Sequence, residues 1–144
     1  MDIKERCISK KEYLKRDDSN VGYALHVQNN IKKDDYARLN TGEIVKVTGI
    51  RENQVDKKAI YFGIYDDDWC NSAAVENFSE NIIDLIEVGD IVNKSEVYEI
   101  GQSEDGQKWI HTYQGILYYE EDLQKATILT HELYNANCYK VKGE

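Results

Sequence analysis

The feature that most constrains the fold is a predicted β-hairpin in the second half of the chain. Two strand-like segments, SEVYEIGQ (95–102) and QKWIHTYQG (107–115), flank the tetrapeptide SEDG. Asp-Gly is a strong hairpin signal between two such segments, because tight hairpin turns favour residues that accept a positive φ. The sequence therefore predicts an antiparallel pair of strands here.

Further strands are predicted before and after this hairpin. EIVKVTGI (43–50) alternates apolar and polar residues, as a half-buried strand does, and KKAIYFGIY (57–65) follows it after the turn RENQVD. We expect these two segments to pair as a second hairpin. The other predicted strands are VGYALHVQ (21–28), the end of 82–93 after a Gly89-Asp90 turn, ILYY (116–119) and the start of 126–141.

Short helices are expected between the strands. Ser9 and Glu12 have the spacing of a capping box and predict a helix over 10–17. Thr130 is the predicted N-cap of a second short helix near the C-terminus, where Glu132 would complement the helix dipole. Single helical turns are predicted near 32–39 and 72–78.

The length of 144 residues suits one domain that buries roughly 68% of its unfolded surface. We find no internal repeat and no linker. The prediction is a single small α+β domain over 1–144, mainly an antiparallel curled sheet or partly open β-barrel with short helices. Its parts would be a helical N-terminal segment (1–20), a first strand group (21–65), an acidic loop (66–81) and a second strand group with a short C-terminal helix (82–144).

Charge is concentrated in the middle of the chain. Residues 66–122 hold 15 acidic and 2 basic side chains, whereas residues 1–65 hold 10 acidic and 13 basic ones. Nucleic-acid phosphates are contacted by Lys and Arg, so we expect no direct nucleic-acid binding. The chain begins with the charged segment DIKER and has no apolar run of the ~18–20 residues that cross a bilayer. A cytoplasmic protein without a membrane partner is therefore expected.

No metal site is predicted. Asp66, Asp67 and Asp68 are adjacent and lack the staggered spacing and glycine of a calcium loop. His131-Glu132 begins like the zinc motif H-E-x-x-H, but the fifth position is Asn135.

No catalytic site or cofactor is predicted either. Cys7, Cys70 and Cys138 are widely spaced without a CxxC motif, and we expect free thiols in a reducing compartment. The sequence has no phosphate-binding glycine loop and no G-x-S-x-G nucleophile motif. A non-enzymatic protein is expected.

Two runs place aromatic rings directly beside three carboxylates. They are Tyr65, Asp66, Asp67, Asp68 and Trp69, and Tyr118, Tyr119, Glu120, Glu121 and Asp122. Carboxylates on a surface can imitate phosphates and attract a basic partner, while the rings supply contact area. The competing interpretation is that the rings belong to the core and the acids to solvated turns.

NIIDLIEVGDIVN (81–93) and ILTHELYNANCYKV (128–141) resemble segments of a group of short phage and prophage proteins of low-GC Gram-positive bacteria. Those proteins pair an IIDLIEVGD-(I/Y)-VN segment with a C-terminal ILT-(K/H)-E…Y-(K/R)-V segment. The resemblance covers roughly the C-terminal half of the chain and transfers no active residue. It implies a small accessory phage protein.

Three functions are therefore considered. The first is a phage protein that inhibits a host antiviral defence in the cytoplasm of the infected cell, by docking the two acidic aromatic runs on a basic effector protein. The second is a sponge that sequesters a nucleotide immune signal, with Tyr13, Tyr36, Arg38 and Arg51 as candidate binding residues. The third is a virion component or a phage regulatory protein. Self-association into a homo-oligomer stays open.

Overall fold

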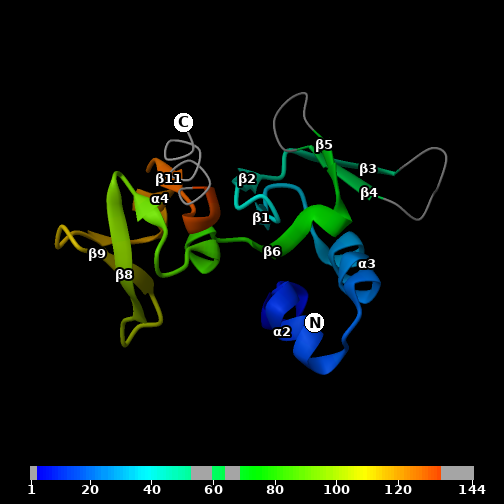
Figure 1. Cartoon of the computed structure of the whole chain (residues 1–144), viewed down its shortest axis with the longest axis horizontal. Helices are drawn as coiled ribbons and strands as arrows, with labels where there is room; N and C mark the ends of the chain where they lie inside the picture. Colours follow the sequence, from blue (N-terminus) through cyan, green and yellow to red (C-terminus); the bar gives the residue numbers. More distant parts are fainter. Residues whose placement is uncertain (1–2, 53–59, 64–68, 134–144) are drawn as a thin grey trace, which may run out of the picture. The chain divides into compact units, whose positions relative to one another are not determined.

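The computed structural model describes residues 3–52, 60–63 and 69–133 (Figure 1). The fold is α+β, and every strand pairing is antiparallel, as predicted. No closed barrel forms among these residues, where the strands make one five-stranded and two three-stranded sheets. No helix in the described part of the chain is both long and apolar enough to cross a bilayer.

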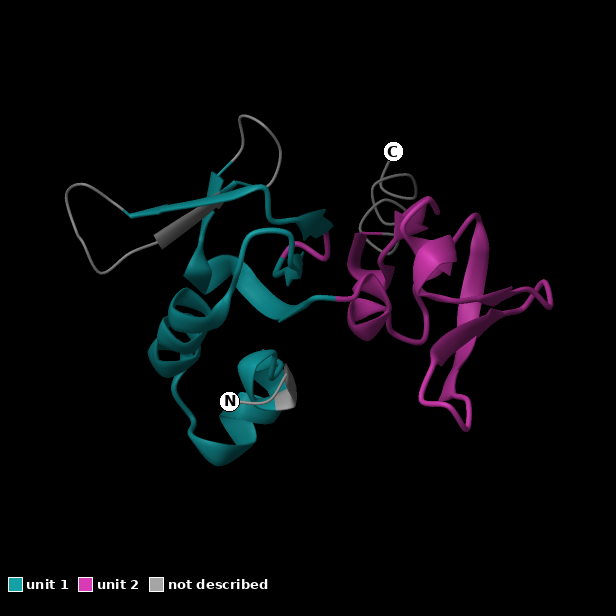
Figure 2. Ribbon diagram, turned by 180° about the vertical axis from the view of Figure 1, so that it is seen from behind, with its two compact units in different colours: residues 1–40, 44–80 teal, residues 41–43, 81–144 magenta. Residues whose placement is uncertain are grey.

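The chain divides into two compact units (Figure 2). Unit 1 comprises residues 1–40 and 44–80, and unit 2 comprises residues 41–43 and 81–144. The break after residue 80 lies at the end of the predicted acidic loop, next to the second strand group.

Unit 1 begins with helices and continues with short strands. Its elements are α1 (Ile3–Arg6), α2 (Lys10–Arg16), α3 (Asn20–Asn30), β1 (Tyr36–Leu39), β2 (Ile44–Lys46), β3 (Gly49–Glu52), β4 (Ile60–Gly63), β5 (Trp69–Asn71), the 3-10 helix η1 (Ser72–Ala74) and β6 (Val75–Ser79). The strand orders are β2-β1-β6 and β3-β4-β5. Helix α3 packs against η1, and α2 packs against α3 and β6.

The segment 21–28, predicted as a strand, is helix α3. Ser19 caps it by accepting a hydrogen bond from the Gly22 backbone N–H at 2.9 Å. Tyr23 and Val27, one helical turn apart, are 1% and 0% exposed and face the core. The cap and this spacing of four residues outweigh the β-like composition of the segment.

Two other predictions for unit 1 are corrected. The region near 32–39, predicted as a helical turn, ends in strand β1, and Asp34 before it has a positive φ of 75°. The predicted turn at 72–78 is helical only over η1, because Val75–Ser79 form strand β6 and pair with β1. The predicted helix after Ser9 is confirmed as α2, with Ser9 accepting from the Glu12 N–H at 3.2 Å.

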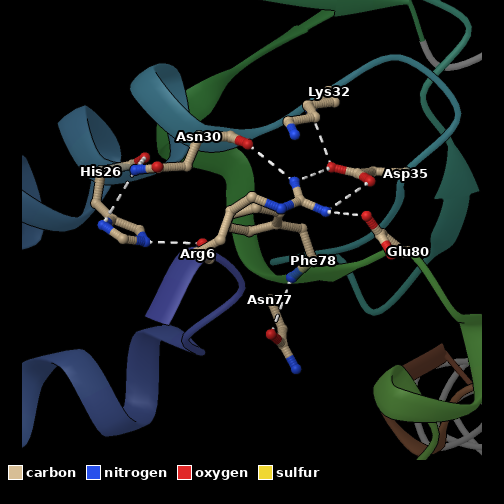
Figure 3. A network of polar contacts seen from close by, with 8 residues as sticks. All are labelled: Arg6, His26, Asn30, Lys32, Asp35, Asn77, Phe78 and Glu80. Atoms are coloured by element: carbon tan, nitrogen blue, oxygen red, sulfur yellow. Dashed lines mark hydrogen bonds and ion pairs between the residues drawn. The ribbon is translucent and has the colours of Figure 1, made fainter. Parts of the chain in front are cut away.

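A buried ion pair joins the N-terminal helix to the rest of unit 1 (Figure 3). Arg6 donates to both carboxylate oxygens of Asp35, at 2.7 and 3.2 Å, and to the backbone carbonyl of Asn30 at 2.9 Å. Glu80 contacts the same guanidinium at 3.2 Å, and Phe78 lies beneath it, 5.9 Å from the ring centroid. Because Arg6 and Asp35 are only 8% and 3% exposed, this pair fixes helix α1 against α3 and β1.

Unit 2 is built on one five-stranded sheet of order β10-β9-β8-β7-β11. Its elements are the 3-10 helix η2 (Ile82–Leu85), β7 (Ile91–Val92), β8 (Ser95–Gln102), β9 (Lys108–Thr112), β10 (Leu117–Tyr118), α4 (Glu120–Leu123) and β11 (Ile128–Leu129). Helix α4 was not predicted. Residues 131–133 are helical, as expected after Thr130, although the buried Thr130 hydroxyl makes no hydrogen bond within the described residues.

The predicted hairpins are confirmed. In unit 2, β8 pairs with β9 through the Ser103–Gly106 turn, where Gly106 has a φ of +88°. In unit 1, β3 pairs with β4, but Arg51 and Glu52 of the predicted turn belong to β3. Segment 43–50 contains β2 and the start of β3, and not one strand. Nine apolar residues of unit 2 are buried: Ile82, Ile83, Leu85, Ile86, Val92, Val97, Ile110, Tyr118 and Leu123.

Candidate functional site

The first acidic aromatic run lies mostly outside the described residues. Tyr65, Asp66, Asp67 and Asp68 fall there, so their predicted role in binding stays a prediction. Trp69 is described at the start of β5 and is 37% exposed.

The second run supplies several contacts within unit 2. Tyr118 is 8% exposed, and its hydroxyl accepts a hydrogen bond from the Asn93 side chain at 3.4 Å. Asp122 accepts from the Tyr119 backbone N–H at 3.0 Å and so caps helix α4. Glu121 is exposed. The surface available to a partner from this run is therefore smaller than its sequence suggests.

Glu120 joins this run to the start of the 3-10 helix η2. Its carboxylate accepts hydrogen bonds from the backbone N–H groups of Ile82 and Ile83, at 2.5 and 3.3 Å. Burial raises the pKa of Glu120 above its ordinary value, and these two hydrogen bonds oppose part of that rise. Glu120 is thus a structural cap within unit 2.

The candidate nucleotide-binding residues occupy different surroundings within unit 1. Tyr13 packs on the rings of Tyr23 and His26, with centroids 5.4 and 5.8 Å away. Lys46 lies over the ring of Tyr36 at 5.8 Å. Arg38 is only 2% exposed, which leaves its guanidinium little access to an external phosphate.

Arg51 lies with Trp69 on the β3-β4-β5 sheet. The guanidinium carbon is 4.2 Å from the Trp69 ring centroid, and both side chains are exposed. Gly49 lies next to this pair, and a Cβ there would only make ordinary van der Waals contact with the indole, at 3.7 Å. A planar cation on an aromatic ring is a surface on which a base or another flat group can stack.

An exposed aromatic face on the β8–β9–β10 sheet was not predicted. We define the aromatic face as Tyr98, Trp109, His111, Tyr113 and Leu117. The Tyr98 ring centroid lies 4.8 Å from that of His111 and 4.9 Å from that of Tyr113. Tyr113 is 70% exposed and Leu117 is 47% exposed.

The register of the strands explains why these side chains share one side. His111 lies opposite both Glu99 on β8 and Leu117 on β10, and directly paired residues point to the same face. The alternate residues Ile110 and Thr112 are 0% exposed and point into the core. A register shift at Val97/Glu99 brings Tyr98 beside His111, with the hydroxyl 2.5 Å from Nδ1.

Gly101 shapes the same face. It pairs with Trp109, and a Cβ at Gly101 would clash with the indole. The missing side chain therefore lets the indole lie against the backbone of Gly101. The sequence did contain part of the signal. Residues alternate in SEVYEIGQ and KWIHTYQ, and Gly106 marks the turn between the two strands. Only the bulge, which brings Tyr98 to the same side as the other rings, could not be foreseen.

A cluster of ionisable groups in unit 2 could hold a cation. The nearest ligand atoms of Glu87, His131 and Glu132 all lie within 4.8 Å of one another. Behind them, the buried carboxylate of Asp90 accepts from the Glu87 N–H at 2.8 Å, the His131 N–H at 2.9 Å and His131 Nδ1 at 3.0 Å. The cluster lies where residues 87–92 and 128–132 come together, because β7 pairs with β11.

Cys7 and Cys70 are free thiols, as expected, while Cys138 lies outside the described residues. Burial raises the pKa of Cys7 to about 11, which keeps it as the unreactive thiol at neutral pH.

No family model matches this chain, and no curated protein or solved structure shows significant similarity to it.

Proposed function

We propose that this chain is a non-enzymatic binding protein that docks the aromatic face of unit 2 onto a basic surface of a partner protein. The observation that supports this most is the contact of the exposed Tyr98 ring with the exposed ring of Tyr113 and the half-buried ring of His111. Tyrosine and tryptophan are enriched at protein interfaces, where a partner buries their apolar area and pairs with their polar tips.

Charge supports a basic partner. By sequence, unit 2 carries 13 acidic and 5 basic side chains, a net charge of −8, whereas unit 1 carries 14 and 13, a net charge of −1. Glu96 and Glu99 on β8 and Glu121 after β10 are exposed. A ring cluster within a negative field attracts a positively charged surface and speeds the encounter with it.

The partner we propose is a host defence effector, bound in the cytoplasm of an infected cell. This part rests on the resemblance of 81–93 and 128–141 to phage proteins. Both segments belong to unit 2, the unit that carries the aromatic face. A virion component could use the same surface but would be located in the particle, so detection of the chain in purified particles would contradict the defence proposal.

The experiment is a binding measurement with matched variants. The tagged chain captures partners from a host lysate, and the purified partner is then titrated against wild type and Tyr98→Ser/Tyr113→Ser. We expect the double variant to bind about tenfold more weakly or worse, since exposed rings dominate such interfaces. Val21→Ser/Leu25→Ser removes apolar residues of α3 that are 72% and 47% exposed, and it should leave the affinity unchanged.

A second candidate function is sequestration of a nucleotide signal by unit 1. The Arg51–Trp69 stack favours it, because a base can stack there while a guanidinium binds phosphate. A panel of cyclic nucleotides in a thermal-shift assay tests it, with a rise in melting temperature that Arg51→Ala abolishes. An unchanged melting temperature across the panel would exclude this candidate.

A further inference from the structure

The polar cluster at the joint of the 87–90 turn and the segment after β11 is independent of the aromatic face. It consists of Glu87, Asp90, His131 and Glu132, all in unit 2. We call it the Glu-His-Glu cluster. None of its members belongs to the surface proposed above.

The imidazole of His131 is oriented by a buried carboxylate. Asp90 is 0% exposed, and its Oδ1 lies 3.0 Å from His131 Nδ1 and 2.9 Å from the His131 backbone nitrogen. An ionised carboxylate at this position accepts a hydrogen bond from Nδ1–H, so Nδ1 carries the hydrogen and Nε2 is the nitrogen left to bind a cation.

Nε2 faces two further carboxylates. It lies 3.1 Å from Glu132 Oε1 and 3.8 Å from Glu87 Oε1. With the hydrogen on Nδ1, the Nε2 lone pair and the two carboxylate oxygens are three donor atoms that one metal ion can share.

We propose that Glu87, His131 and Glu132 bind a divalent first-row transition metal ion, with Asp90 as the residue that orients His131. Three ligand atoms around one metal, with bonds of about 2.0–2.2 Å, lie roughly 3.3–3.6 Å apart in tetrahedral geometry. The two separations from Nε2, 3.1 and 3.8 Å, lie close to this range, and all three ligand atoms lie within 4.8 Å of one another. A metal-binding histidine normally donates its other ring N–H to a carboxylate, the arrangement of His131 and Asp90.

The donor set indicates the class of metal. One imidazole nitrogen and two carboxylate oxygens suit Zn²⁺ and Mn²⁺, whereas a site made for Ca²⁺ would use oxygen ligands throughout. The three side chains are 33–55% exposed, so a fourth position faces solvent. The bound ion would hold the turn at Glu87 to the segment that begins at His131.

The test is a titration of the full chain with ZnCl₂ in a non-chelating buffer, followed by calorimetry. Because thiolates also bind zinc, the background carries serine at Cys7, Cys70 and Cys138. We expect one equivalent to bind, with an affinity that falls at least tenfold in Glu87→Gln, His131→Gln and Glu132→Gln. The matched controls His111→Gln and Glu121→Gln remove an equivalent group elsewhere in unit 2 and should leave the affinity unchanged.

A second measurement does not depend on the cysteine substitutions. Mn²⁺ prefers oxygen and nitrogen to sulfur, and it broadens NMR signals of nearby nuclei, so titration of the unmodified chain should broaden His131 before His111. Equal broadening of both histidines, or zinc binding that survives His131→Gln, would overturn the proposal.

Discussion

Asp90 and His131 are joined twice, since one carboxylate accepts hydrogen bonds from both the backbone N–H and the ring Nδ1 of the histidine. The other oxygen of Asp90 accepts from the Glu87 N–H at 2.8 Å and closes the turn before β7. One buried side chain thus ties residues 41 positions apart in the sequence.

Asp90→Ala should destabilise the protein by about 2–4 kcal/mol, because two backbone donors and a ring donor lose their acceptor in a buried place. Asp90→Asn keeps one acceptor oxygen and should cost less. Urea denaturation measures both free energies of unfolding. Glu121→Ala, on the surface, is the control and should stay within about 0.5 kcal/mol of wild type. Equal stability of Asp90→Ala and the control would show that Asp90 is not a structural link.

Arg6→Met should destabilise the protein by about 3–5 kcal/mol, because it leaves the Asp35 carboxylate buried without its guanidinium. The double variant Arg6→Met/Asp35→Leu removes both charges and should recover a large part of that loss. The double-mutant cycle in guanidinium chloride gives the coupling energy. A double variant as unstable as the sum of its two single variants would contradict a direct interaction.

Glu120 should make stability fall as the pH rises. Its pKa in the folded chain lies above the ordinary value of 4.5, so the folded state holds the proton more tightly than the unfolded state does. The stabilisation from that proton is complete below pH 4.5 and is lost as the pH rises through the folded pKa. Glu120→Gln should flatten this part of the stability–pH profile, whereas Glu121→Gln should not. Identical profiles for wild type and Glu120→Gln would refute the assignment.

Gly101→Ala should displace Trp109. The new Cβ would meet the indole, which has to move out from β8 into water. In a Trp69→Phe background, where Trp109 is the sole fluorophore of its kind, we expect a red shift of the emission and a loss of about 1–2 kcal/mol of stability. The control is Gln102→Ala, on the same strand as Gly101. Gly115→Ala would not serve as a control, because Gly115 has a φ of +82° and an alanine there would be strained. An unshifted emission spectrum would mean that the indole does not lie on Gly101.

Local signals predicted the hairpins well. The Ser103–Gly106 turn and the Ser9 cap depend on neighbours within a few residues, so residue type alone identifies them. The prediction of a strand over 21–28 was wrong because the apolar residues of this segment suit either a strand or a helix. What decides for a helix is the pairing of Tyr23 and Val27 with a core built from distant residues.

The candidate site was harder to predict, because it also depends on contacts between residues that are distant in the sequence. The composition of LYYEED suggests an exposed surface. Tyr118 is nevertheless buried, and Glu120 accepts hydrogen bonds from the N–H groups of Ile82 and Ile83. Both features depend on contacts between distant parts of the chain. The aromatic face was missed because a single bulge at Val97/Glu99 brings Tyr98 into line with His111. The Asp90–His131 link crosses between two sequence segments, and no spacing within either one reveals it.

The most direct test of the central claim is the dissociation constant of the captured partner, measured at about 50 and 300 mM salt for wild type, Tyr98→Ser/Tyr113→Ser and Glu99→Lys/Glu121→Lys. We predict a basic partner, weaker binding at high salt, and a loss of affinity in both double variants while Asp18→Lys in unit 1 binds like wild type. A partner that binds both double variants as tightly as wild type, with no dependence on salt, would contradict docking through the aromatic face.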